Sequence, residues 1–223
     1  MTIIYDPAKH VPDVNHWEGI PDHARMHAAG VRRAVTKLTE GRNFGDPLAG
    51  YAFRRWKELG IEREAYHFLT VWDDPVEQVL VFHAALQGVY WQPTEPIWLD
   101  LEGRSLSTAW RALGLVGIRK KLRPFILAAV RACIQRIGVT PGIYVGASFW
   151  NSYVGALDFQ AEGLPIPRLW SPDYGWNGEG SGIVEPRWIN PTSWPRGWQR
   201  WQFTDRGRLP GVSGAVDLNI ERA

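Results

Sequence analysis

Residues 96–103 read Pro-Ile-Trp-Leu-Asp-Leu-Glu-Gly, an apolar run that proline enters and glycine closes, with two acids at its far end. This pattern predicts a short buried β-strand. Side chains two residues apart on a strand point to the same face, so Asp100 and Glu102 should lie roughly 6.5 Å apart along it. Two acids on one face of a buried strand are costly unless they are paired or used. The stretch therefore marks either a strand end whose acids meet solvent or an arginine, or a functional site.

Short apolar runs alternate with helical patterns along the rest of the chain, which predicts an α/β protein with a mainly parallel sheet. The other expected strands are residues 10–15, 33–38, 65–69, 142–145, 168–170, 200–203 and 215–219. Helices are expected over residues 46–59, from Asp74 onward, over 124–137 and over 149–154. The first five strands are followed by helices and the last three are not. We therefore predict an irregular TIM-like barrel of five βα units followed by three strands with little helix.

The composition is that of an ordinary globular protein, with 45% hydrophobic and 22% charged residues in 223. Neither a linker nor an internal repeat divides the chain, so we expect one domain over residues 1–223. The long glycine- and tryptophan-rich stretch over residues 174–197 is expected to be a functional loop. The basic run at residues 119–123 is interpreted as a solvated helix face rather than a nucleic-acid patch, because no nucleic-acid-binding motif accompanies it. We see neither a signal peptide nor a membrane span, which predicts synthesis in a cytoplasm and no membrane partner.

Several chemistries find little support in the sequence. His23 and His27 stand four residues apart, but Ala24 occupies the place where a zinc protease needs its glutamate, so we interpret them as surface histidines. Cys133 lies in an apolar helical pattern and is expected to be a buried structural thiol. A Gly-x-Ser-x-Gly elbow is lacking. We therefore expect no metal, no cofactor and no nucleophilic serine or cysteine.

What remains is a set of carboxylates at expected strand ends. They are Asp13, Glu40, Asp100, Glu102, Asp173 and Asp217. In a parallel barrel the carboxyl ends of the strands converge on one rim, where active sites are built. Each acid alone could be a helix cap or a salt-bridge partner. Several on one rim beside Trp and Tyr favour glycoside hydrolysis, which needs one protonated acid and one stabilising anion.

Seven sequence blocks make the chain similar to a known family. They are residues 13–19 (DVNHWEG), 37–41 (KLTEG), 65–68 (AYHF), 98–102 (WLDLE), 141–144 (PGIY), 201–203 (WQF) and 216–219 (VDLN). In this order they resemble glycoside hydrolase family 25, the muramidases or lysozymes of the bacterial and phage type. The family fold is an irregular barrel of five βα units followed by three strands, which agrees with the independent count above.

The resemblance implies a role for each matching residue. Glu102 would be the general acid and Asp100 its partner, with Asp13 and Asp217 as the other acids of the cleft. The candidate substrate-binding residues are Tyr66, Tyr144, Trp201, Gln202, Trp170 and Glu40. The implied activity is cleavage of the β-1,4 bond between N-acetylmuramic acid and N-acetylglucosamine in peptidoglycan glycan strands.

Together with the expected lack of a signal peptide, the resemblance suggests a phage endolysin or its catalytic module, which reaches the wall after the membrane is permeabilised. Two alternatives stay open. One is a chitin-type hydrolase on the same barrel, and the other is a non-catalytic protein that binds peptidoglycan or another sugar.

Overall fold

The structure is a computed structural model that describes residues 3–174 and 189–222. Its strands are β1 (Ile3–Ile4), β2 (His10–Val14), β3 (Arg33–Glu40), β4 (Phe44–Gly45), β5 (Glu62–Phe68), β6 (Ile97–Asp100), β7 (Gly142–Tyr144), β8 (Leu169–Pro172), β9 (Arg200–Arg208) and β10 (Val216–Glu221). Its α-helices are α1 (His23–Ala28), α2 (Ala49–Leu59), α3 (Pro75–Gly88), α4 (Thr108–Arg111), α5 (Gly114–Ala132) and α6 (Ala147–Tyr153). Two 3-10 turns, η1 (His16–Glu18) and η2 (Gly103–Ser105), and a π-helical turn, η3 (Cys133–Ile137), complete the described elements.

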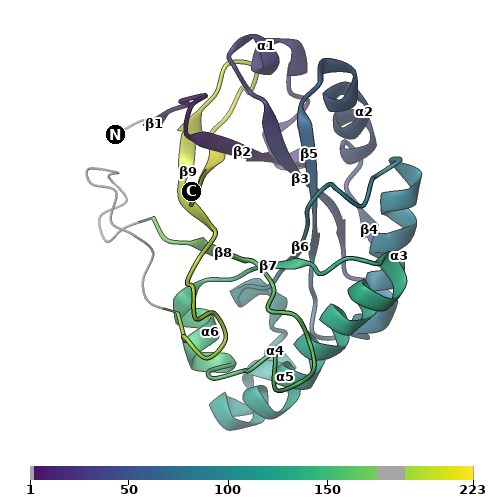
Figure 1. Ribbon diagram of the computed structural model, residues 1–223, viewed down its shortest axis with the longest axis vertical. Coiled ribbons are helices and arrows are strands. Elements are labelled where there is room, and N and C mark those ends of the chain that lie inside the picture. The colour runs from purple at the N-terminus through teal and green to yellow at the C-terminus, as the bar shows by residue number, and fades with distance from the viewer. Residues whose placement is uncertain (1–2, 175–188, 223) are drawn as a thin grey trace.

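Eight strands close into a barrel in the order β2, β3, β5, β6, β7, β8, β9, β10 (Figure 1). All neighbours are parallel except β10, which is antiparallel to both β9 and β2. The short strands β1 and β4 pair with β9 and β3. An α-helix follows each of β2, β3, β5, β6 and β7, whereas the described residues between β8, β9 and β10 contain none. The predicted irregular barrel of five βα units and three strands is therefore confirmed.

One helix boundary differs from the prediction. The helix expected to begin at Pro124 begins at Gly114, and Pro124 lies inside α5. A proline inside a helix removes a hydrogen bond and costs about 3 kcal/mol. Ile118 and Leu122, which precede Pro124, are both buried against the main core, and their burial offsets that cost. The basic residues 119–121 are exposed on this helix, as expected.

The predicted surface position of His23 is wrong. His23 is buried under α2, where its Nδ1 accepts a hydrogen bond from the indole N–H of Trp56 at 2.9 Å. The sequence spacing carried no information on this contact, which joins α1 to α2. Within the described ranges, His, Cys, Asp and Glu side chains form no group of three that could hold a metal ion. Likewise, none of the described helices is long and apolar enough to cross a membrane.

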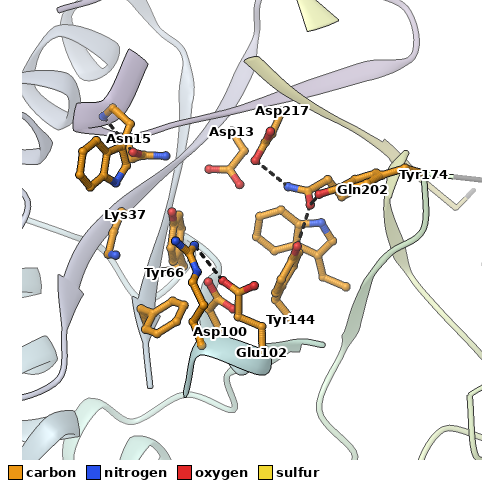
Figure 2. A pocket seen from close by; sticks show the side chains of 14 residues that line it. Asp13, Asn15, Lys37, Tyr66, Asp100, Glu102, Tyr144, Tyr174, Gln202 and Asp217 are labelled. Atoms are coloured by element: carbon orange, nitrogen blue, oxygen red, sulfur yellow. Dashed lines mark hydrogen bonds and ion pairs between the residues drawn. The ribbon is translucent and has the colours of Figure 1, made fainter. Parts of the chain in front are cut away.

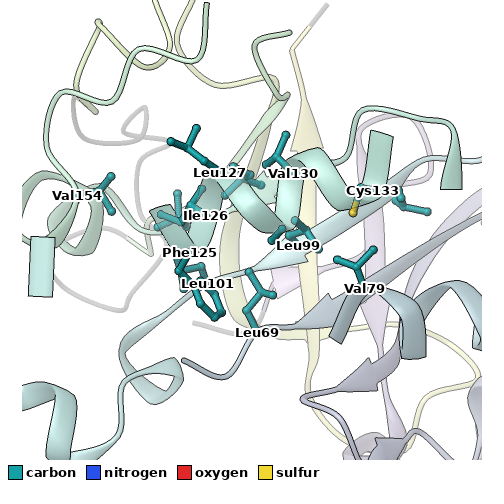
Figure 3. Close-up of a cluster of buried hydrophobic side chains, with 14 of the residues drawn as sticks. Leu69, Val79, Leu99, Leu101, Phe125, Ile126, Leu127, Val130, Cys133 and Val154 are labelled. Atoms are coloured by element: carbon teal, nitrogen blue, oxygen red, sulfur yellow. The ribbon is translucent and has the colours of Figure 1, made fainter. Parts of the chain in front are cut away.

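The main core lies between the outer face of the sheet and helices α3, α5 and α6 (Figure 3). From β6 and the residue after it, Leu99 and Leu101 point outward into this core. Cys133 is buried there too, and burial raises the pKa of its thiol, as expected for a structural cysteine. Since side chains alternate along a strand, the outward leucines direct Trp98 and Asp100 into the barrel.

A polar cluster fills the barrel one layer beneath Asp100. The guanidinium of Arg200 donates to both carboxylate oxygens of Glu64, at 2.7 and 2.6 Å, and the indole of Trp98 donates to Glu64 at 2.6 Å. Gly142 on β7 makes room for this indole, because a Cβ atom there would lie 2.2 Å from Cε3 of Trp98. This layer closes the barrel and forms the base on which the residues two positions further along each strand rest.

Candidate active site

A cavity of about 160 Å³ opens at the carboxyl ends of the barrel strands. Its lining residues are Asp13, Asn15, Trp17, Lys37, Tyr66, Phe68, Asp100, Glu102, Arg104, Tyr144, Trp170, Tyr174, Gln202 and Asp217. Figure 2 shows Asp13 and Asp217 on one side of the cavity and Asp100 and Glu102 on the other. The four acids that the sequence singled out as catalytic candidates therefore line one space.

Strand β6 brings Asp100 and Glu102 to the cavity. Asp100 is the last residue of β6 and lies between Phe68 of β5 and Tyr144 of β7. Glu102 keeps an extended backbone and begins the turn η2, in which its backbone N–H donates to the hydroxyl of Ser105 at 3.0 Å. This continuation of the strand leaves both acids facing the cavity, as the spacing predicted.

The two acids differ in their surroundings. Asp100 is buried, and its Oδ1 has no hydrogen-bond partner among the described residues. Burial, followed by the charge of Glu102, raises the pKa of Asp100 well above its usual range. Glu102 is partly exposed, with 34% of its side chain accessible, and accepts a hydrogen bond from Arg104 at 3.1 Å. Glu102 thus makes the arginine contact that a strand end without function could also show, while Asp100 lies beneath it as a desolvated acid.

Asp13 and Asp217 face this pair from neighbouring strands. They are direct partners in the antiparallel pairing of β2 and β10. Asp13 is buried and its Oδ1 also lacks a partner among the described residues. Burial and then the charge of Asp217 raise the pKa of Asp13. Burial and then Glu18 raise the pKa of Asp217 to about 7. The cavity thus contains acids that hold protons at unusually high pH, which suits general acid–base chemistry.

The tyrosines and Gln202 form one hydrogen-bonded group. Tyr144 and Tyr174 both donate to Oε1 of Gln202 at 2.7 Å, and Nε2 of Gln202 donates to Asp217 at 3.0 Å. Tyr66 lies with its ring edge-on to Trp170, which forms the floor of the cavity. Four of the predicted substrate-binding residues, Tyr66, Tyr144, Trp170 and Gln202, therefore lie at the cavity.

Two predicted contact residues lie elsewhere. Trp201 is 3% exposed, and its indole donates to the backbone carbonyl of Asp173 at 2.7 Å. It alternates along β9 with Arg200 and Gln202, which face the barrel interior, so Trp201 faces outward. Glu40 pairs with Lys37, and only Lys37 lines the cavity. The position of Trp201 favours the interpretation as core over sugar contact.

The sequence reasoning assigned no role to six of the lining residues: Asn15, Trp17, Lys37, Phe68, Arg104 and Tyr174. Trp17 is 80% exposed at the rim. The sequence did contain a signal for Trp17. Asn15 and Glu18 have the spacing of a capping box, and in the structure they form one, in a tight turn that holds Trp17 outward. Lys37 could have been found from the alternation along β3. Arg104 depends on the path of the turn after Glu102, which no local pattern specifies.

Known proteins resemble this chain in sequence and in fold. The model of the family described as Glycosyl hydrolases family 25 matches residues 12–212. Lysozyme M1 of Streptomyces globisporus is 30% identical over 210 residues, which are 93% of this chain and 65% of that protein. The chain thus spans slightly less than two thirds of the length of this relative.

Two solved structures share the fold. The bacterial lysozyme from Streptomyces coelicolor superposes with a TM-score of 0.77 at 25% identity, over 96% of this chain and 92% of that chain. The catalytic domain of endolysin ply40 from bacteriophage P40 of Listeria monocytogenes gives a TM-score of 0.67 at 20% identity, over 100% and 94% of the two chains. The second likeness concerns the fold alone.

Proposed function

The chain belongs to glycosyl hydrolase family 25, and on this premise we propose that it is a muramidase that hydrolyses the β-1,4 bond between N-acetylmuramic acid and N-acetylglucosamine in peptidoglycan. One observation carries the proposal. Two acids from the end of β6, one buried and one open to the cavity, face two further acids from β2 and β10. Glycoside hydrolysis needs such a set, in which one carboxyl donates a proton and another carries negative charge.

In the proposed mechanism Glu102 is the general acid. It is the member of the β6 pair that is open to the cavity, so it can donate a proton to the glycosidic oxygen as the C–O bond breaks. Asp100 lies beneath it and keeps a proton more readily than an ordinary Asp. The pair can therefore retain one proton between two carboxyls. Once Glu102 has delivered that proton to the leaving oxygen, both members of the pair are carboxylates until one of them takes up a proton again.

Asp100 is poorly oriented to attack the sugar itself. It leaves β6 on the same face as Glu102, whereas a nucleophilic carboxylate must approach from the opposite side of the sugar ring. We propose that Asp100 orients the 2-acetamido group of muramic acid, whose carbonyl oxygen then attacks the anomeric carbon. Asp13 and Asp217, across the cavity, are the alternative source of a nucleophile or a base.

This mechanism predicts net retention of the anomeric configuration. Proton NMR of the product anomers early in the reaction tests it, because retained product must appear before mutarotation. Initial release of the inverted anomer would instead indicate a carboxylate-activated water, and a trapped sugar ester on an aspartate would indicate direct attack.

Reducing-end analysis of digested, purified peptidoglycan tests the activity. New N-acetylmuramic acid ends would support the proposal, and new N-acetylglucosamine ends would contradict it. Digestion of chitin oligomers but not of peptidoglycan would favour the chitin-type alternative. Binding to walls without any new reducing end would favour the non-catalytic alternative, against which the complete set of four acids argues.

We further propose that the protein acts on the wall as a phage endolysin or its catalytic module. On this proposal, cells that express it should lyse only when their membrane is permeabilised, and the optical density of the culture reports the outcome. Lysis that needs no permeabilisation would contradict it.

A further inference from the structure

Gln202 joins three strands of the barrel and the segment after a fourth. It lies on β9 and is 2% exposed. Its single amide group contacts Tyr144 at the end of β7, Tyr174 just after β8 and Asp217 on β10 (Figure 2). All three contacts are at hydrogen-bonding distance, between 2.7 and 3.0 Å. Little of this amide is free to bind a sugar.

The contacts fix which way the amide points. A glutamine amide has an accepting end and a donating end. Two phenol hydroxyls donate to Oε1 of Gln202, so Nε2 faces Asp217. With the amide reversed, its oxygen would face a carboxylate oxygen and repel it unless Asp217 carried a proton. The orientation of Gln202 is therefore linked to the charge on Asp217.

The hydrogen bond from Nε2 of Gln202 stabilises the carboxylate form of Asp217 among groups that oppose that form. Four acids interact with the charge of Asp217: Asp13 on β2, Glu18 in η1, Asp205 on β9 and Glu102 after β6. The nearby phenols of Tyr144 and Tyr174 are neutral, since burial raises the pKa of both. Burial and the charges of Glu18, Asp205 and Glu102 raise the pKa of Asp217, and the hydrogen bond from Gln202 opposes them.

We propose that Gln202 is a positioning residue that sets the charge state of Asp217 and orients the phenols of Tyr144 and Tyr174, rather than a residue that binds sugar. Its Oε1 accepts hydrogen bonds from both phenols and fixes their orientation, and its Nε2 donates to the Asp217 carboxylate and stabilises it. The consequence for catalysis rests on the proposed function: the donor of Gln202 favours the carboxylate form of Asp217, which faces the Asp100–Glu102 pair across the cavity. The hydrogen bonds themselves do not depend on that function.

The test follows the Asp217 carboxyl carbon by ¹³C NMR during a pH titration of the substrate-free protein. Wild-type Asp217 should titrate with a midpoint near 7. Gln202→Met, of similar length, removes the donor to Asp217 without adding a second acid, so its Asp217 midpoint should lie roughly one pH unit higher or more. Tyr174→Phe is the matched control: it removes one contact to Oε1 and should leave the midpoint unchanged.

A second titration uses only the wild-type protein, so its result does not depend on whether a variant folds. The side-chain NH₂ resonances of Gln202 should titrate with the same midpoint as the Asp217 carboxyl. Independent midpoints, or an Asp217 midpoint in Gln202→Met equal to that of the wild type, would overturn the proposal. If the titrations couple as expected but the protein releases no reducing ends from peptidoglycan, the proposed function fails while the role of Gln202 stands.

Discussion

Trp17 and Trp201 have the same side chain but opposite surroundings. Trp17 is 80% exposed at the rim of the cavity, and Trp201 is 3% exposed on the outward side of β9. The rings of Trp198 and Phe203 pack against Trp201, with their centroids 6.2 and 5.9 Å from the centroid of its ring. An exposed flat ring beside a cavity suits the face of a sugar, whereas an enclosed one contributes to packing.

This contrast predicts two different losses. Trp201→Ala should cost about 3–5 kcal/mol of unfolding free energy and leave the affinity for peptidoglycan fragments unchanged. Trp17→Ala should weaken that affinity by about 0.5–1.5 kcal/mol, with a stability change within about 0.5 kcal/mol. Urea unfolding and calorimetric titration measure the two quantities. A stable Trp201→Ala protein with weakened binding would restore Trp201 as a sugar contact.

At the scale of the element, β9 carries both Arg200, in the layer beneath the site, and Gln202, which lines the cavity. Arg200 and Gln202 point into the barrel from successive inward positions. Arg200 lies fully buried between Trp98 and Trp170, with its guanidinium 4.8 and 5.3 Å from their ring centroids. It also donates to Glu221 on β10 at 2.6 Å. The ion pair with Glu64 thus connects β9 to β5 across the barrel, directly under the acids.

Breaking this pair should destabilise the barrel. Arg200→Met leaves the buried Glu64 with only Arg33 as a cation, whose Nε lies 3.7 Å from Oε1 of Glu64. The loss of the bidentate partner should cost about 3–5 kcal/mol of unfolding free energy. Replacing both partners in Glu64→Met/Arg200→Met should recover part of that loss, because no buried charge is then left unpaired. Urea unfolding of the three proteins checks the order. A double variant less stable than Arg200→Met would show that the pair is not coupled in this way.

At the scale of the whole molecule, the alternation of strands and helices was sufficient to predict the barrel, its five βα units and a gathering of acids at one rim. The resemblance to the family then selected the four acids that line the cavity. Alternation works because it depends only on which side chains are buried. It could not supply the contact of the Trp56 indole with His23, which joins α1 to α2, or the continuation of α5 through Pro124. Arg104 was missed because its place at the cavity depends on the turn after Glu102, whereas the alternation along β3 could have identified Lys37. The expected loop over residues 174–197 falls in part on residues 175–188, outside the described residues.

The acids of the site should lower the stability of the whole molecule at neutral pH. The folded state raises the pKa of Asp217 to about 7, against about 3.9 in an unfolded chain. Between these values the folded state binds more protons, so stability falls as pH rises from about 4 to about 7. Asp217→Asn removes this titration. Its stability relative to the wild type should therefore rise between pH 4 and pH 8, by at most about 4 kcal/mol.

Thermal melting of both proteins at the two pH values measures this difference, and each protein at pH 4 serves as its own control. An Asp217→Asn protein that gains no stability relative to the wild type on going to pH 8 would mean that Asp217 is not a desolvated acid.

The most direct test of the central claim is the rate at which Glu102→Gln releases reducing ends from purified peptidoglycan. Gln keeps the size and hydrogen-bonding capacity of Glu102 but has no proton to donate to the leaving oxygen. We expect a loss of at least about a hundredfold relative to the wild type, with an unchanged melting temperature. The exposed Glu162→Gln, at a surface ion pair with Arg131, should retain full activity. A Glu102→Gln protein that releases reducing ends at nearly the wild-type rate would contradict the assignment of Glu102 as the general acid.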